Sequence, residues 1–280
     1  MQLNSKAVVP NTNDAGSDPE NSFRILISSD SHLGFKEADP VLGDDSFRVF
    51  DEVLEKANQL EVDFVLLGGD LFHVMHPSSD TYLRASHIFN KHVWGMSSPT
   101  KSQAESESIE NRVTFETANY EGANYMDKNH KVRLPIFSIH GNHDCPAGLD
   151  LTGALDQLDT NSYVNYFGKI SNIEHAVIEP VLFGKGKTKI ALYGLGYIKD
   201  NRLNLLFERN DIEFRRPMLE NGEVDPDFYN ILVLHQNRYK GINGWSTRDS
   251  ITDETIPDWF DLAVWGHEHE CIGMREVPST

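Results

Sequence analysis

Short apolar runs alternate along the chain with segments of helical periodicity. Five of these runs are short enough to be buried strands, and they span Arg24–Ser29, Val62–Leu67, Ile136–Ile139, Tyr229–Leu234 and Asp261–Trp265. Between them, apolar residues recur at helical spacing in Phe47–Ala57, Tyr82–Phe89 and Leu151–Leu158. Strands that alternate with helices predict a layered α/β fold.

Local signals refine several of these elements. Asp44, Asp45 or Ser46 is available to cap the first helix, and Pro77-Ser78-Ser79 opens the second. Asp200 is expected to cap a helix that runs through Phe207. Two further strands, Ile173–Phe183 and Lys189–Leu195, are predicted on either side of a Gly-Lys-Gly turn.

Polar segments mark the predicted boundaries. Residues 1–22 lack periodicity and are expected to form a flexible tail, followed by a folded domain over 23–280. Residues 97–130 are too long for an ordinary connection, so they are predicted to be an insertion with one short strand near Val113–Phe115. The chain ends soon after the last apolar run, and we therefore expect an N-terminal fragment of a longer protein.

Composition limits the function. The formal net charge of −18 argues against nucleic-acid binding by bulk charge alone. It does not exclude a phosphate substrate, because carboxylates that hold divalent cations count as negative here. The two cysteines do not suggest a disulfide framework, and no apolar stretch is long enough to span a bilayer.

Polar side chains with ligand chemistry follow each of the five apolar runs. They are Asp30 and His32, Asp70, Asn142 and His143, His235, and finally His267 and His269. In open α/β sheets, ligands gather at the carboxyl ends of the strands, so we expect these residues to converge. Oxygen and imidazole ligands without a thiolate suit Mn²⁺, Fe or Zn better than Ca²⁺ or a structural zinc site.

The number of candidate ligands favours two ions. Two aspartates, one asparagine oxygen and four or five imidazoles give at least seven ligands, which are too many for one tetrahedral ion but suffice for two if one carboxylate bridges them. Two ions about 3.5–4 Å apart can stabilise an in-line displacement at phosphorus. Taken one at a time, these residues have ordinary structural explanations: Asp30 could be a turn residue, Asp70 a helix cap and His235 a core histidine. Because a candidate ligand follows all five apolar runs, a shared site for phosphate-ester hydrolysis is favoured.

The order of these motifs resembles that of the calcineurin-like metallophosphoesterases. Asp-x-His, Gly-Asp, Gly-Asn-His-Asp, a strand-terminal His and Gly-His-x-His succeed one another. The segments LLGGDLFH, PIFSIHGNHD, KIALYGLG, LHQNR and WGHEHEC are similar to those of the meiotic recombination eleven family of double-strand-break repair nucleases. Protein phosphatases of the superfamily would carry Gly-Asp-x-Val-Asp-Arg-Gly, whereas Leu-Phe-His follows Asp70 here.

This resemblance implies a four-layer α/β/β/α sandwich of two mixed sheets flanked by helices, with two Mn²⁺ ions; Mg²⁺, Fe and Zn are alternatives. The implied ligands are Asp30, His32 and His269 for one ion, Asn142, His235 and His267 for the other, and Asp70 as the bridge. The resemblance further implies that His143 acts as general acid or phosphate stabiliser, that Asp144 orients it, and that His73 helps to place the phosphate.

The implied function is that of a Mn²⁺-dependent 3′–5′ exonuclease and single-strand endonuclease that acts on DNA ends in the nucleus. Implied partners are an ABC-type ATPase subunit, a phosphopeptide-binding regulatory subunit near residues 97–130, and a second copy of the chain through the helices that carry Leu83 and Leu155. The cap and ATPase-binding regions of the family are expected to lie outside this chain. The alternatives are a phosphoprotein phosphatase or small phosphodiesterase, and an inert scaffold.

Overall fold

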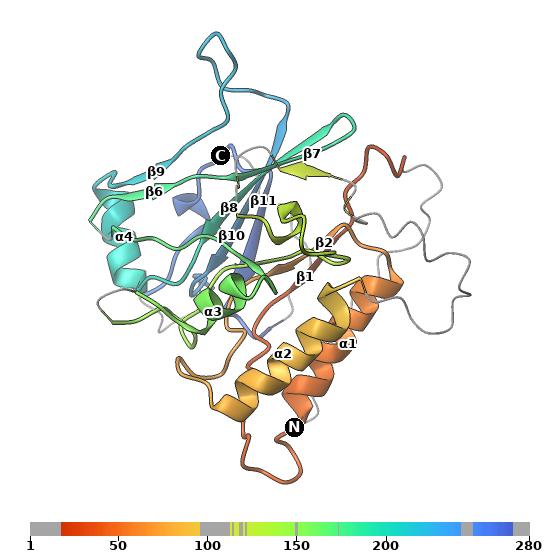
Figure 1. Cartoon of the computed structure of the whole chain (residues 1–280). Helices are drawn as coiled ribbons and strands as arrows, with labels where there is room; N and C mark the ends of the chain where they lie inside the picture. Colours follow the sequence, from red (N-terminus) through yellow and green to blue (C-terminus); the bar gives the residue numbers. More distant parts are fainter. Residues whose placement is uncertain are drawn as a thin grey trace, which may run out of the picture.

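Two β-sheets lie face to face between helices. The computed structural model describes residues 18–95, 113, 115–117, 120, 122–148, 151–172, 174–241 and 249–270. Figure 1 shows helices α1 (Asp45–Gln59) and α2 (Ser79–Val93) side by side on one side of the sheets, and α4 (Asp200–Glu208) on the opposite side. The expected α/β/β/α layering is confirmed.

The first sheet is parallel throughout. Its strand order is β1-β2-β4-β5. The strands are β1 (Ile25–Ser28), β2 (Phe64–Leu67), β4 (Ile136–Ser138) and β5 (Asn165–Tyr166). Their carboxyl ends therefore meet at one edge of the sheet.

The second sheet is mixed, with the order β11-β10-β8-β7-β3. Its strands are β11 (Leu262–Gly266), β10 (Phe228–His235), β8 (Thr188–Leu195), β7 (Val181–Lys185) and β3 (Glu116–Thr117). The first three are parallel to one another, and β7 and β3 continue the sheet antiparallel. The strand expected near Val113–Phe115 lies slightly later, at β3, and Phe115 is a buried core residue.

The single strand expected over Ile173–Phe183 is wrong. Two strands occupy this segment, β6 (Ala176–Ile178) and β7, and they belong to different sheets. β6 pairs with β9 (Ile212–Phe214), whereas β7 pairs with β8. Pro180 lies between the two strands, and a proline has no N–H with which to continue a ladder.

The helices follow the apolar periodicity, but two expected caps are absent. Ser78 caps α2 by accepting the Thr81 N–H at 3.1 Å. Asp44 occupies the N-cap position of α1 without a side-chain capping bond. Asp200 is the first residue of α4, and its carboxylate accepts the Asn237 side-chain amide at 2.7 Å instead. The remaining helix, α3 (Ala154–Thr160), packs beside β5.

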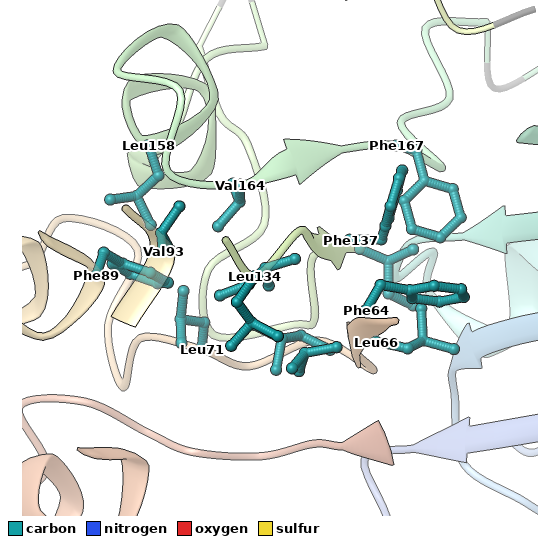
Figure 2. Packing of buried hydrophobic residues seen from close by; sticks show 14 of the residues in the cluster. Phe64, Leu66, Leu71, Phe89, Val93, Leu134, Phe137, Leu158, Val164 and Phe167 are labelled. Atoms are coloured by element: carbon teal, nitrogen blue, oxygen red, sulfur yellow. The ribbon is translucent and has the colours of Figure 1, made fainter. Parts of the chain in front are cut away.

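Aromatic rings fill the space between the two sheets. Phe64 and Phe137 of the first sheet lie 5.4 Å apart by ring centroid, and Phe183 of the second sheet stacks on Phe64 at 5.1 Å. These rings belong to a larger cluster that continues to the helices; Figure 2 shows Phe64, Phe137 and Phe167 at one end of it, and Phe89 and Val93 of α2 with Leu158 of α3 at the other. A second cluster, which includes Tyr193 and Leu203, packs between the second sheet and α4. The first cluster therefore joins the two sheets to each other and to α2 and α3.

The folded part of the chain begins before the expected end of the N-terminal tail. Residues 1–17 of the expected tail lie outside the described residues. Asn21 already contacts the β7–β8 turn, since its side-chain oxygen accepts the Lys187 N–H and its carbonyl accepts the Thr188 hydroxyl.

No helix in the described part of the chain is long and apolar enough to cross a membrane.

We predict that Phe64→Ala lowers the free energy of unfolding by about 3–5 kcal/mol, because it opens a cavity between the two sheets. Phe64 is fully buried. Urea unfolding followed by circular dichroism would measure this change. Val49→Ala is the matched control on the exposed face of α1, with an expected change below about 0.5 kcal/mol. Equal midpoints for wild type and Phe64→Ala would contradict the assignment of this core.

Candidate metal centre

The structure brings all seven predicted ligands to the carboxyl ends of five strands, three in the first sheet and two in the second, which run parallel within each sheet. Each lies at or just after the end of its strand. In the first sheet, Asp30 and His32 follow β1, Asp70 follows β2 and Asn142 follows β4. In the second sheet, His235 ends β10, and His267 and His269 follow β11. Each predicted ligand set draws on both sheets. Asp30 and His32 of the first sheet meet His269 of the second, and Asn142 of the first meets His235 and His267 of the second.

The first group consists of Asp30, His32 and His269. Their ligand atoms all lie within 4.8 Å of one another. The Nε2 atoms of His32 and His269 are 3.2 Å apart, and His269 Nε2 is 3.3 Å from Asp30 Oδ1. Asp30 Oδ1 is buried without a hydrogen-bond partner among the described residues. A buried carboxylate oxygen that faces imidazole nitrogens fits a divalent cation.

The second group surrounds the ring of His235. The Nδ1 of this residue hydrogen-bonds to the Gly68 carbonyl at 2.7 Å, which requires the proton to be on Nδ1. In the neutral ring Nε2 then carries a lone pair, the arrangement usual for a metal-binding histidine. Nε2 lies 3.3 Å from Asp70 Oδ2 and 3.2 Å from Asn142 Oδ1. Asp70, His235 and His267 also form a group with the spacing of metal ligands.

Asp70 lies between the two groups. Its Oδ2 is 3.3 Å from His235 Nε2 and 3.7 Å from His32 Nε2, while Oδ1 accepts the His143 backbone N–H at 2.8 Å. The side chain is 1% exposed. This position fits a carboxylate that serves two ions.

Electrostatics favour a cation at this position. Burial by itself raises the pKa of the Asp70 carboxyl. The hydrogen bond and charge of His235 lower this pKa by a larger amount, so that it lies below the ordinary value. Burial lowers the pKa of His235, and Asp70 more than offsets this, so that the pKa is raised. Burial also lowers the pKa of His32 to about 4, which keeps that ring neutral and able to bind a metal.

Backbone conformation is unusual at four of the candidate ligands. Asp30, His32, Asp70 and His267 have φ values of 57°, 46°, 50° and 78°, in the left-handed region that disfavours non-glycine residues. Such conformations cost about 1–3 kcal/mol each and persist where the surrounding structure enforces them, most often at functional sites.

Glycines allow the close approach that the site needs. A Cβ on Gly141 would lie 2.1 Å from Asp70 Oδ1. Gly69 has φ of 99°, and a Cβ there would lie 2.5 Å from the His235 ring. Any side chain at either position would displace a candidate ligand.

His143 and His73 lie together beside the two groups. Their rings stack at 5.1 Å, and His143 Nδ1 is 2.7 Å from the His73 carbonyl oxygen, which fixes the proton on Nδ1. The ring of His143 also contacts that of His32 at 4.8 Å. In the neutral ring, Nε2 of His143 then carries the lone pair.

Asp144 holds the backbone around the site. Its carboxylate accepts N–H bonds from Gly141 at 2.7 Å, Leu71 at 2.8 Å and Phe72 at 3.2 Å. It thereby ties the turn after β4 to the turn after β2, whereas the carbonyl of His73 orients His143. Burial raises the pKa of Asp144 to about 6. The expectation that Asp144 orients His143 is therefore replaced by a role in positioning the two turns.

Three supporting contacts were not foreseen from the sequence. The Ser29 hydroxyl donates to Asp30 Oδ2, and the Gly68 carbonyl orients His235. His140 is buried, and its Nδ1 lies 2.7 Å from the Tyr166 hydroxyl. The ring of His140 occupies the space that Gly196 leaves open. Ser29 directly precedes Asp30, so the sequence offered this contact as a candidate. The other two pairs could not be identified from spacing, because their partners come from different strands and turns.

The fold and this site are those of a metal-dependent phosphoesterase, and comparison with known families agrees. Residues 23–271 match the calcineurin-like phosphoesterase family, so the chain belongs to this family. Family membership implies divalent metal ions, and the His and Asp groups described above are suited to hold them.

Similar curated proteins from several organisms are named double-strand break repair protein MRE11. The chain is 43% identical to that of Oryza sativa over 94% of this chain and 37% of the relative. It is 42% identical to those of Arabidopsis thaliana and Homo sapiens, over 91% of this chain and 35% and 34% of the relatives. The chain thus spans about a third of the length of the curated relatives it matches.

We predict that Gly141→Ala weakens Mn²⁺ binding at least about tenfold, because the added methyl group displaces the Asp70 carboxylate. Isothermal titration calorimetry would measure the affinity and the number of ions bound. Gly184→Ala in β7, where a Cβ meets nothing within 4 Å, is the control. Unchanged Mn²⁺ affinity in Gly141→Ala would contradict the assignment of Asp70 as a ligand.

Proposed function

We propose that this chain is the catalytic domain, over residues 23–280, of a Mn²⁺-dependent DNA nuclease in double-strand-break repair. The observation that carries the proposal is the pair of ligand groups that meet at the buried Asp70 carboxylate. The similarity to proteins named for double-strand break repair supports DNA as the substrate.

One ion would be held by Asp30, His32 and His269, the other by Asn142, His235 and His267, with Asp70 between them. When bound, such ions supply Lewis-acid stabilisation of phosphoryl charge and a water nucleophile at neutral pH. The protein contributes a fixed ligand geometry, since the orienting contacts from Gly68, Ser29 and Asp144 keep the donor atoms aimed at the centre.

His143 is proposed as the general acid. Its Nδ1 proton is engaged by the His73 carbonyl, so Nε2 is the atom that gives a proton to the leaving oxygen when the P–O bond breaks. The stacked ring of His73 keeps His143 in this orientation and faces the same space. His73 is therefore proposed to help place the scissile phosphate.

The proposed activities are 3′–5′ exonuclease and single-strand endonuclease action in the nucleus, with an ABC-type ATPase subunit and a phosphopeptide-binding regulatory subunit as partners. Most of residues 97–130, the proposed contact of the regulatory subunit, lies outside the described residues. For a homodimer, α2 offers the exposed Leu83, whereas Leu155 of α3 is 1% exposed in the chain's own core. The proposed dimer surface therefore rests on α2.

Two substrates test the proposed activity directly. We expect the Mn²⁺-loaded chain to hydrolyse a labelled single-stranded oligonucleotide and to leave a serine phosphopeptide intact. Denaturing gels and phosphate release would measure the two reactions, with EDTA as the control. Turnover of the phosphopeptide without cleavage of DNA would favour a phosphatase, and turnover of neither would favour an inert scaffold.

We predict that His143→Asn lowers the rate of DNA cleavage at least about 100-fold and keeps the bound Mn²⁺, because it removes a proton donor and no ligand. Cleavage rates and elemental analysis of the same preparation would measure both effects. The exposed His175, replaced by Asn, is the control. Wild-type cleavage by His143→Asn would refute the role of this residue.

A further inference from the structure

An exposed aromatic ring lies at the rim of the candidate metal centre. Phe35 follows the candidate ligand His32 by three residues and is 45% exposed. Its ring contacts the ring of His73 edge to face, with centroids 4.9 Å apart and planes at 80°. Most phenylalanine side chains are buried, and Phe35 is the one phenylalanine among the exposed large hydrophobic residues of the described part of the chain.

Phe35 is the outermost member of a cluster of rings. The rings of His32, His143 and His73 contact one another, with centroids 4.8, 5.1 and 5.4 Å apart, and His73 contacts Phe35. The cluster leads from a candidate metal ligand to solvent. The Lys36 ammonium lies over the Phe35 ring, 5.4 Å from its centroid.

The backbone holds Phe35 in this position. Its N–H donates to the His32 carbonyl at 3.0 Å. The neighbouring Leu33 forms a bridge with Phe72, and the Leu33 carbonyl accepts the His73 N–H at 3.0 Å. The turn is thus tied directly to the residue that contacts the Phe35 ring, so the aromatic surface is preorganised.

This arrangement suits a nucleobase. Exposed aromatic side chains bind single-stranded nucleic acid by stacking on the bases, whatever their sequence, and a nearby cation attracts the backbone phosphate. A phosphate positioned between the metal groups and His143 would place an adjoining base within reach of Phe35.

We propose that Phe35 is the stacking platform for the base next to the scissile phosphate, and that the exposed Lys36 ammonium, which lies over this ring in the free chain, moves to the adjoining phosphate. This inference rests on the proposed nuclease function and names the part of the substrate that this rim recognises. It also provides a source of affinity for DNA in a chain whose net charge is −18.

Binding to strands with and without bases tests the proposal. The ligands are a short fluorescent thymidine oligonucleotide with phosphorothioate linkages and the same backbone without bases, and the protein is loaded with Mn²⁺. We expect Phe35→Leu to weaken binding of the thymidine strand about tenfold by fluorescence anisotropy, in line with the loss of one stacked base. Binding of the abasic strand should not change, and Phe35→Trp should restore the wild-type affinity.

Tyr229→Leu is the matched control. Tyr229 is a similarly exposed aromatic residue near the start of β10, at the opposite end of this strand from His235. Its loss should leave both affinities unchanged. Equal affinity of wild type and Phe35→Leu for the thymidine strand, or an equal loss on both strands, would overturn the proposal. Cleavage of DNA by the wild-type chain is measured separately, so failure of this inference is distinct from failure of the proposed function.

Discussion

The buried carboxylate of Asp70 is the group on which the arrangement of the site depends. Transfer of an ionised carboxylate from water into a protein interior is costly unless cations and donors surround it. Asp70 accepts the His143 N–H on one oxygen and faces His235 and His32 with the other. The glycine at 141 and the left-handed backbone at Asp70 itself make this placement sterically feasible. The local sequence around Asp70 therefore serves one electrostatic requirement.

Asp144 is a second buried carboxylate, and backbone N–H groups compensate for its burial. It receives three backbone N–H bonds and no cation, and burial together with the nearby charge of Asp70 raises its pKa. Its bonds join the turns that carry Asp70 and Asn142. The two aspartates thus differ in role. Asp70 is positioned to bind cations, and Asp144 holds the backbone turn that positions Asp70.

The sequence predicted those parts of the site that depend on strand direction. Strands that run parallel in one sheet bring their final residues to one edge of that sheet, so the grouping of Asp30 with Asp70 could be predicted from their places in the chain. That this edge meets the edge of the second sheet that carries His235 was an expectation from open α/β sheets, which the structure bears out. Contacts across the fold could not be predicted in this way. The pairing of His140 with Tyr166 and the exposure of Phe35 depend on how turns pack, and the break at Pro180 depends on which sheet each strand joins. Spacing along the chain predicts where a strand ends, but it does not predict how turns pack or which sheet a strand joins.

The two sheets are also joined at the metal centre, and this links the site to the core. Gly266 at the end of β11 lies so close to the first sheet that a Cβ would be 2.1 Å from the Gly68 carbonyl. His235 bonds to that same carbonyl, and the His267 N–H donates to Asp30. Because each ligand group combines residues from both sheets, the spacing set by Phe64 and Phe183 determines the distance between the two halves of the site. Ions bound there would in turn connect the sheets, so metal binding contributes to the stability of the sandwich as well as to its chemistry.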